Sequence, residues 1–290
     1  MGMSNHQSVS LEEVVRRAAD LPSAPWLLPK LMEQLADPDS AAGQVEALIK
    51  VDAALAAGTL RLANSAFLNA AMPCDSLTDA IVRLGYREIY RLATTKIAAR
   101  WLTHEVKGYG WQPGDLYAHS LATAVAADLL ARHYGTVDAE IAYTAGLLHD
   151  VGKLALAYTC GEYFSCVRDY QAREQCPWRV AELQIFGFDH TQVAAGLVRS
   201  WDFPESLVDV VGFYPRPGAA SPQHRPLVAI VHAAKHLALC LGTGVGEDGF
   251  TSELDEAVLR NEGIAPEVAE RLLPSVVELT SRLLHPSPAR

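Results

Sequence analysis

Nearly every apolar pattern in this 290-residue chain has the period of an α-helix. We find no convincing run in which apolar and polar residues alternate with the β-branched side chains typical of strands. Half of the residues are hydrophobic, which is enough to fill a substantial core. The sequence therefore predicts an all-α protein built as one large domain or two small ones.

Local signals predict where several of these helices end. Ser10 and Glu13 have the spacing of a capping box before the first apolar face, and Pro22 ends that helix. Gly85 closes a later helix, because glycine is favoured just after a helix C-terminus. A cluster of glycine and proline at 108–114 then breaks the chain and marks the best candidate boundary.

The overall charge limits the partners. The chain has 24 Lys and Arg against 34 Asp and Glu, a formal charge of -10 at pH 7, and it has no basic run. A negative field of this size disfavours binding to nucleic-acid polymers or to anionic lipid. We expect neither of these partners.

The expected compartment is the cytoplasm. The five cysteines are odd in number and include no C-x-x-C pair, so neither a disulfide framework nor a zinc ribbon is indicated. The first ten residues are polar and predict no signal peptide, and the most apolar stretch, 227–246, contains two histidines and a lysine.

The strongest chemical signal is the adjacent pair His149 and Asp150 at the end of an apolar helix. Neighbouring side chains on a helix diverge by about 100°. Both can therefore reach one ion only if the helix breaks there, and Gly152 favours such a break. An imidazole nitrogen and a carboxylate oxygen suit Fe, Mn or Zn. The alternative interpretation is a helix cap next to a hydrogen-bonded histidine.

Two further histidines strengthen the metal interpretation. His119 follows Asp115 by four residues, a spacing that places both on one helix face. His190 follows Asp189 at an expected helix start. Each histidine taken alone is more often structural than a ligand.

The order of the motifs is more specific than any one of them. The second half contains His119, Gly-Leu-Leu-His-Asp-Val-Gly-Lys at 146–153, Phe-Gly-Phe-Asp-His at 186–190 and Trp-Asp-Phe-Pro at 201–204. The first half contains Asp-Ala-Ala-Leu at 52–55, Arg-Leu-Ala-Asn-Ser-Ala at 61–66 and Asp-Ala-Ile-Val-Arg-Leu-Gly at 79–85. Over residues 21–239 this series resembles the HDOD family, relatives of the HD and HD-GYP phosphohydrolases.

The resemblance implies an N-terminal helical bundle packed on an HD-like helical core. It divides the chain into an N-terminal extension at 1–20, an N-terminal helical lobe at 21–107, an HD-like helical lobe at 108–241 and a C-terminal helical extension at 242–290. It also implies a ligand set for one divalent metal and a lysine that contacts phosphate. The ligands are His119, His149, Asp150 and His190, with Asp115 as a candidate fifth; the phosphate contact is Lys153.

Two expected features of the phosphohydrolases are missing. The position of their His-His pair reads Phe213-Tyr214, and Lys235 stands where the family often has an Asp ligand. An ammonium repels a divalent cation, so the two-metal site that activates water is not expected to form. His232 and His236 are spaced to share a metal, but packing is the preferred interpretation because they lie within an apolar segment.

Three functions remain open at this level. The first is a regulatory protein with little or no catalysis that acts in trans on other components of a bacterial signalling pathway, with no certain cofactor. The alternative is a metal-dependent phosphohydrolase acting on a nucleotide or cyclic dinucleotide. The third is a sensor whose pocket binds a metal or a small phosphate ligand without turnover. The apolar residues at 268–279 would serve either an internal core or a homodimer contact.

Overall fold

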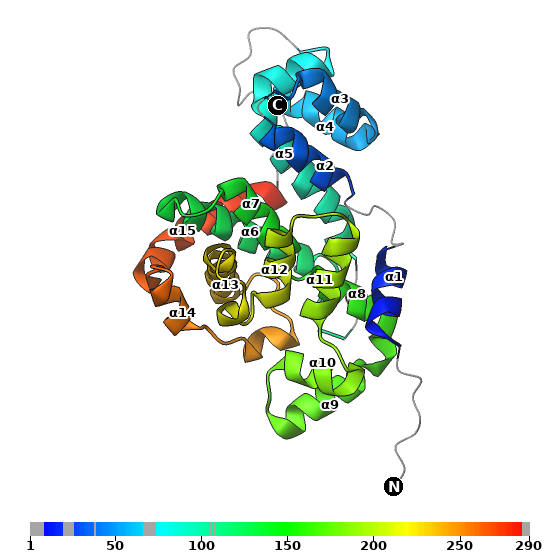
Figure 1. Ribbon diagram of the computed structural model, residues 1–290, viewed down its shortest axis with the longest axis vertical. Coiled ribbons are helices and arrows are strands. Elements are labelled where there is room, and N and C mark those ends of the chain that lie inside the picture. Colours follow the sequence, from blue (N-terminus) through cyan, green and yellow to red (C-terminus); the bar gives the residue numbers. More distant parts are fainter. Residues whose placement is uncertain are drawn as a thin grey trace.

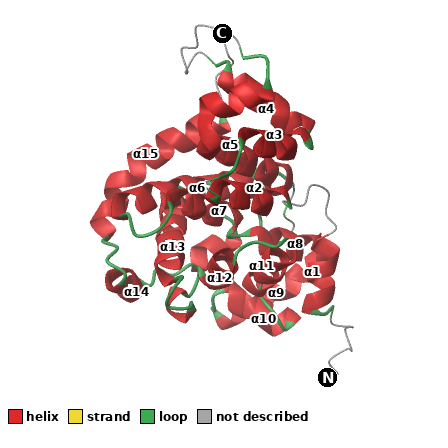
Figure 2. Cartoon of the chain, turned by 45° about the horizontal axis from the view of Figure 1, so that its top comes forward, coloured by secondary structure: helices red, strands yellow, loops and turns green. Residues whose placement is uncertain are grey.

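A computed structural model describes residues 9–19, 26–37, 39–65, 74–104, 106 and 108–285. Every regular element in these ranges is an α-helix or a short 3-10 helix, so the predicted all-α class is confirmed. Figure 2 shows the same result, with helices throughout. None of the described helices combines the length and the apolar character needed to cross a membrane.

The upper lobe in Figure 1 is formed by α2 to α5. Their bounds are α2 (Leu27–Ala36), α3 (Ala42–Lys50), α4 (Ala53–Ala63) and α5 (Leu77–Leu102). Gly85 interrupts α5 with a non-helical φ of 76° and ψ of 159°, so two helical segments meet there, as the sequence predicts. Asp52 caps α4 by accepting from the amides of Ala54 and Leu55.

The larger lower body carries the remaining helices. Its first helices are α6 (Asp115–Tyr134), α7 (Ala139–Leu148), α8 (Val151–Cys160), α9 (Phe164–Glu174) and α10 (Trp178–Phe186). These are followed by α11 (His190–Ser200), α12 (Glu205–Phe213), α13 (Arg225–Cys240), α14 (Glu256–Asn261) and α15 (Pro266–Leu284). The 3-10 helix η4 (Glu247–Thr251) precedes α14.

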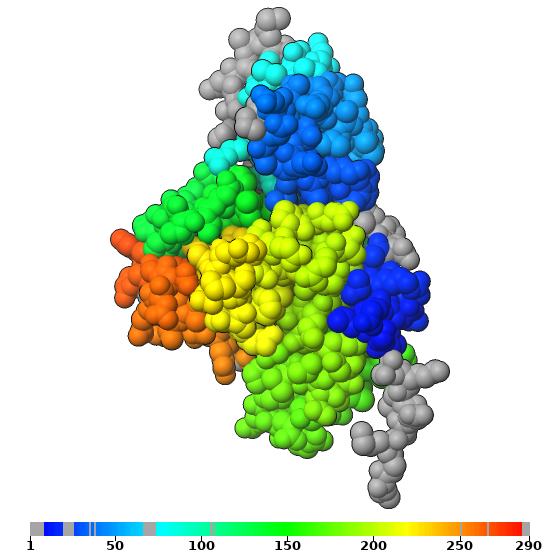
Figure 3. All heavy atoms as spheres, viewed as in Figure 1, coloured from blue at the N-terminus to red at the C-terminus, as the bar shows by residue number. Residues whose placement is uncertain are grey.

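The two ends of the described chain pack on this lower body. Helix α1 (Leu11–Ala19) lies against α8 and α11, apart from α2 to α5, and buries Val14 and Ala18. Figure 3 shows this helix as a dark blue patch on the side of the lower body. Helix α15 packs across α6 and α13.

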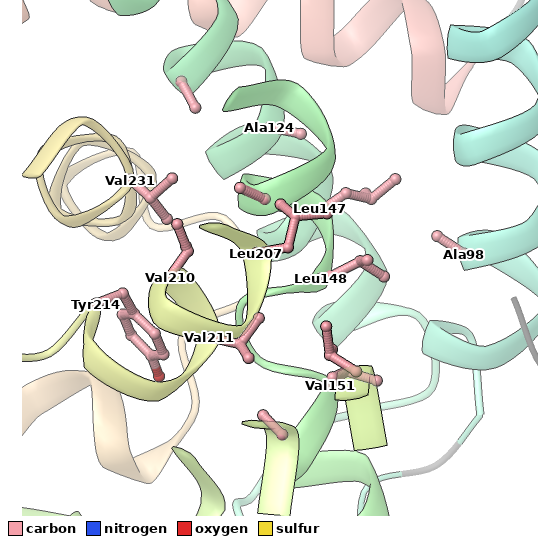
Figure 4. Close-up of a cluster of buried hydrophobic side chains, with 14 of the residues drawn as sticks. Ala98, Ala124, Leu147, Leu148, Val151, Leu207, Val210, Val211, Tyr214 and Val231 are labelled. Carbon is pink, nitrogen blue, oxygen red and sulfur yellow. The ribbon is translucent and has the colours of Figure 1, made fainter. Parts of the chain in front are cut away.

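The main core runs through both parts of the molecule. Figure 4 shows a cluster of buried side chains that includes Ala98 of α5, Leu148 of α7, Val211 of α12 and Val231 of α13. The hydroxyl oxygen of Tyr214 is the polar atom seen among these side chains. The apolar core therefore ends at a buried polar group, and the candidate site lies there.

Candidate metal centre

The junction between α7 and α8 brings His149 and Asp150 to one side. Helix α7 ends at Leu148 and α8 begins at Val151, with Asp150 at φ -100° and ψ 12° between them. The helix therefore breaks at the pair itself, as the metal interpretation requires. The sequence argument attributed that break to Gly152, and this was wrong, because Gly152 lies inside α8.

Gly152 instead permits a close crossing of two helices. A Cβ atom at this position would lie 1.9 Å from the carbonyl oxygen of His190 and 2.8 Å from the amide nitrogen of Ala194. Glycine is the residue that leaves room for such a backbone approach. The crossing of α8 and α11 places His190 beside the His149 and Asp150 junction.

Three of the expected ligands converge. The ligand atoms of His119, His149 and Asp150 all lie within 4.8 Å of one another. Asp150 Oδ2 lies 3.2 Å from His149 Nε2 and 3.8 Å from His119 Nε2. All three residues are almost completely buried, with at most 1% of any side chain exposed.

Hydrogen bonds orient both histidines of this group. His149 Nδ1 lies 2.6 Å from the carbonyl oxygen of Gly146, and His119 Nδ1 lies 3.3 Å from that of Thr243. A carbonyl oxygen only accepts, so each Nδ1 donates its hydrogen, and the neutral ring keeps a lone pair on Nε2. Metal-binding histidines are commonly held in this way.

The two Nε2 atoms are buried without a hydrogen-bond partner among the described residues. Together with Asp150 Oδ2 they form a set of electron-pair donors that face one another. Such a set is unfavourable unless a cation or a proton lies between its members. Two imidazoles and one carboxylate fit a single Fe, Mn or Zn ion with open coordination positions.

The burial of this group changes its protonation. Burial lowers the pKa of His119 to about 3. Burial alone would raise the pKa of Asp150, but its close contacts with His149 and with the ammonium of Lys153 outweigh burial and hold that pKa well below its usual value. A neutral His119 and an ionised Asp150 are the forms that bind a metal.

Lys153 is enclosed by the protein. Its ammonium donates to Asp150 Oδ2 at 2.7 Å and to Asp248 Oδ2 at 2.5 Å, and only 1% of its side chain is exposed. It also lies 5.0 Å from the centre of the Trp111 ring. Burial alone would lower the pKa of Lys153, but the two carboxylates raise it above its usual value. The predicted phosphate contact is therefore engaged in two internal ion pairs.

His190 lies on the other side of Asp150 and is outside the group of three. Its Nδ1 contacts Glu182 Oε2 at 2.6 Å, and its Nε2 contacts the Tyr214 hydroxyl at 3.0 Å. That hydroxyl donates onward to Asp150 Oδ1 at 2.5 Å. Both ring nitrogens of His190 therefore have a protein partner, and neither is open toward the group of three.

The remaining candidates have other contacts. Asp115 accepts from the backbone amide of Gln112 at 2.9 Å and does not join the group of three. His232 donates from Nδ1 to the carbonyl of Tyr214 and accepts at Nε2 from the amide of Asp255. Both nitrogens of His232 are thus satisfied, in agreement with the packing interpretation.

Sequence reasoning missed four polar residues that complete this pocket. Tyr109 donates to Glu182 at 2.6 Å, and Glu182 anchors His190. Tyr214 connects His190 to Asp150, and Asp248 pairs with Lys153 from η4. The departure at Phe213-Tyr214 was a usable signal for Tyr214, whereas Asp248 is 95 residues from Lys153 and no local pattern relates them.

Comparisons with known proteins agree with this architecture. A crystal structure of an HDOD domain protein of unknown function from Geobacter sulfurreducens matches with a TM-score of 0.69 and 26% identity, over 94% of this chain and 98% of that one. A crystal structure from Marinobacter aquaeolei, provisionally assigned to signal transduction, matches with a TM-score of 0.72 and 21% identity, over 98% of this chain and 66% of that one. At that identity the second likeness shows the fold alone.

A curated Treponema pallidum protein, itself uncharacterized, is 25% identical over 223 residues. The match covers 75% of this chain and 42% of that protein, so the chain spans less than half the length of this relative. The model of the HDOD domain matches residues 21–217, which include the upper lobe and the residues around the pocket from His119 to Tyr214. The family prediction is confirmed: the chain belongs to the HDOD family.

Proposed function

We propose that this chain is a regulatory HDOD protein with little or no hydrolase activity, which acts through contacts with other signalling proteins. The observation that carries the proposal is the Tyr214 hydroxyl, which bonds both Asp150 and His190. In a two-metal hydrolase, ligands on both sides of the shared carboxylate hold ions that activate water and stabilise the transition state. Here the His190 side is closed by protein hydrogen bonds.

Charge opposes a second cation in the same place. Lys153 contacts the oxygen of Asp150 that faces the two open histidines. Lys235 is also buried and lies 4.9 Å from the centre of the Tyr214 ring. Two ammonium groups in a low-dielectric pocket disfavour a second divalent ion. The pocket thus retains a frame for ligand binding without the charge pattern of a two-metal site.

One metal remains compatible with the structure. His119, His149 and Asp150 would hold it, and a bound ion would supply Lewis acidity there. The carbonyls of Gly146 and Thr243 fix the two rings, and Lys153 competes for the carboxylate. We propose that such an ion has a structural role: it stabilises the folded pocket, or its presence signals that the pocket is folded.

The second candidate function is a single-metal phosphohydrolase acting on a nucleotide or cyclic dinucleotide. The three convergent ligands favour it. Its weakness is that the described chain places no free acid or base beside them, because His190, Lys153 and Tyr214 are all engaged with protein partners.

Turnover measurements on metal-loaded protein separate the two functions. The full chain, supplied in turn with Mn and Fe, is assayed against cyclic dinucleotides and a generic phosphodiester, with His149→Gln as the control. We expect no difference between the parent and the variant. Hydrolysis that His149→Gln abolishes would refute the regulatory assignment and support the enzyme.

The regulatory role has its own test. The full chain is used to capture partners from an extract of its source cells, and the captured proteins are identified. We expect a signalling protein whose capture is unaffected by His149→Gln. If an unrelated helical protein captured the same partner to the same extent, the result would contradict the proposal.

A further inference from the structure

A small cavity opens beside the buried polar network, and its lining does not include His119, His149 or Asp150. Its volume is about 130 Å³, and its lining includes His190, Tyr214, Lys235 and Asp248. Arg179, Arg216 and Trp178 lie on its other walls. Pockets for drug-sized ligands measure about 300 to 1,000 Å³, so this cavity suits a much smaller group.

Lys235 is the unusual residue of this cavity. Only 8% of its surface is exposed. Its ammonium lies over the ring of Tyr214, but it has no hydrogen-bond or ion-pair partner among the described residues. Burial lowers the pKa of Lys235, and the charge of Lys153 adds to this effect. A buried ammonium that forms no hydrogen bond costs free energy unless a ligand or water accepts from it.

Trp178 lines the same cavity through its ring and not through its polar atom. Its indole Nε1 is enclosed by the surrounding protein and does not reach the cavity surface. The donor that a ligand in this cavity would meet first is therefore the ammonium of Lys235.

Two arginines in the lining add positive charge around the cavity. Arg216 is exposed and forms no ion pair with the described residues, while Arg179 pairs with Asp189 at 2.9 Å. The same two arginines also line a neighbouring cavity of about 360 Å³. A ligand bound at Lys235 could therefore continue past them into the larger space.

Two carboxylates belong to the same lining. Asp248 pairs with Lys153 at 2.5 Å, which offsets its charge, and its other oxygen is enclosed by the protein and does not face the cavity. Glu253 is exposed at the rim, where water screens its charge. Neither carboxylate therefore places a free negative charge beside the ammonium of Lys235.

We propose that this cavity binds a single tetrahedral oxyanion, either free phosphate or the terminal phosphate of a small phosphomonoester, with Lys235 as the central cation. The site differs from the one predicted at Lys153, whose ammonium is paired with two carboxylates and which is not among the residues that line the cavity. It is also separate from the metal ligands His119 and His149. Binding here does not depend on the proposed signalling role.

Calorimetric titration of the full chain with inorganic phosphate tests this, in a buffer free of other oxyanions. We expect Lys235→Met to weaken binding by about tenfold or more, because a hydrogen-bonded charge is lost. Lys50→Met removes an exposed lysine on α3 and should bind as the parent does. Equal affinity in Lys235→Met, or no binding by the parent, would overturn the proposal.

Two further arms make the result decisive. Arg216→Gln changes an exposed side chain and should fold normally while binding several-fold more weakly; unchanged binding would contradict the site even if Lys235→Met failed to fold. Treatment of the full chain with a metal chelator, followed by removal of the chelator, should leave phosphate binding unchanged; a loss would place the anion on a metal instead and overturn the proposal. A nucleoside monophosphate that binds more tightly than phosphate would identify the phosphomonoester as the ligand.

Discussion

The two sides of the buried carboxylate of Asp150 use their histidines in different ways. On one side, His119 and His149 each bond a backbone carbonyl, and Nε2 of each has no hydrogen-bond partner among the described residues. On the other side, His190 uses both nitrogens, one on Glu182 and one on Tyr214. A histidine at a ligand position is thus a potential ligand only if the surrounding protein leaves a lone pair free.

The difference arises in the neighbours of the histidines. The carbonyls of Gly146 and Thr243 occupy only one nitrogen of each ring. Glu182 and Tyr214, by contrast, are side chains placed to fill both nitrogens of His190. The first side therefore keeps the features of a metal site, whereas the second is a protein hydrogen-bond network.

The largest expected effect comes from breaking the ion pairs of Lys153, on the side of Asp150 that faces His119 and His149. Lys153→Met would leave the buried carboxylates of Asp150 and Asp248 without their cation, and we expect a loss of about 3 to 5 kcal/mol in the free energy of unfolding. Urea denaturation followed by circular dichroism measures it.

The matched control for that variant is Arg168→Gln. Arg168 pairs with Glu247, the neighbour of Asp248, but both partners are well exposed, so we expect a change of under about 1 kcal/mol. Equal effects of the two variants would mean that water screens the ion pairs of Lys153. The expected cost of leaving buried carboxylates without their cation would then be wrong.

A smaller effect should follow from pushing the two sides apart. Gly152→Ala would place a Cβ 1.9 Å from the His190 carbonyl oxygen, so α8 and α11 must separate, at a cost of about 1 to 3 kcal/mol. Thermal or urea unfolding checks this. A Cβ at Gly43 on α3 would meet no atom of another described element within 4 Å, so Gly43→Ala should be neutral or slightly stabilising. A neutral Gly152→Ala would show that the helices do not cross this closely.

A further effect, of about the same size, concerns the hydrogen bonds of Tyr214 between the two sides. Tyr214→Phe removes one hydroxyl and leaves Asp150 Oδ1 and His190 Nε2 each without that partner, which should cost about 1 to 3 kcal/mol. Tyr158→Phe is the control, because Tyr158 is 66% exposed and should change little. Metal content should stay the same in Tyr214→Phe, and a second bound ion would show that the tyrosine alone closes the His190 side.

The sequence was sufficient for the features that depend on short-range pattern. The helical period predicted the fold class, and Gly85 was correctly read as a helix end. The pairing of His149 with Asp150 was also predicted, although the role of Gly152 was not, because the close approach of α11 is a tertiary contact.

Long-range partners were beyond the sequence pattern. His190 followed the family order, but its satisfaction by Glu182 and Tyr214 depends on how α10 and α12 pack against α11. Likewise Lys153 was predicted to face a phosphate, whereas Asp248 reaches it from η4. Spacing identifies which residues lie near a site, and the structure is needed to show which of their atoms remain free.

Metal analysis of paired histidine variants tests the central claim most directly. The full chain, His149→Gln and His190→Gln are each loaded in turn with Mn, Fe and Zn, passed through gel filtration, and measured by elemental analysis. The account predicts about one equivalent of metal in the parent and in His190→Gln, and none in His149→Gln. Loss of metal in His190→Gln, or retention in His149→Gln, would contradict the division of this pocket into an open and a closed side.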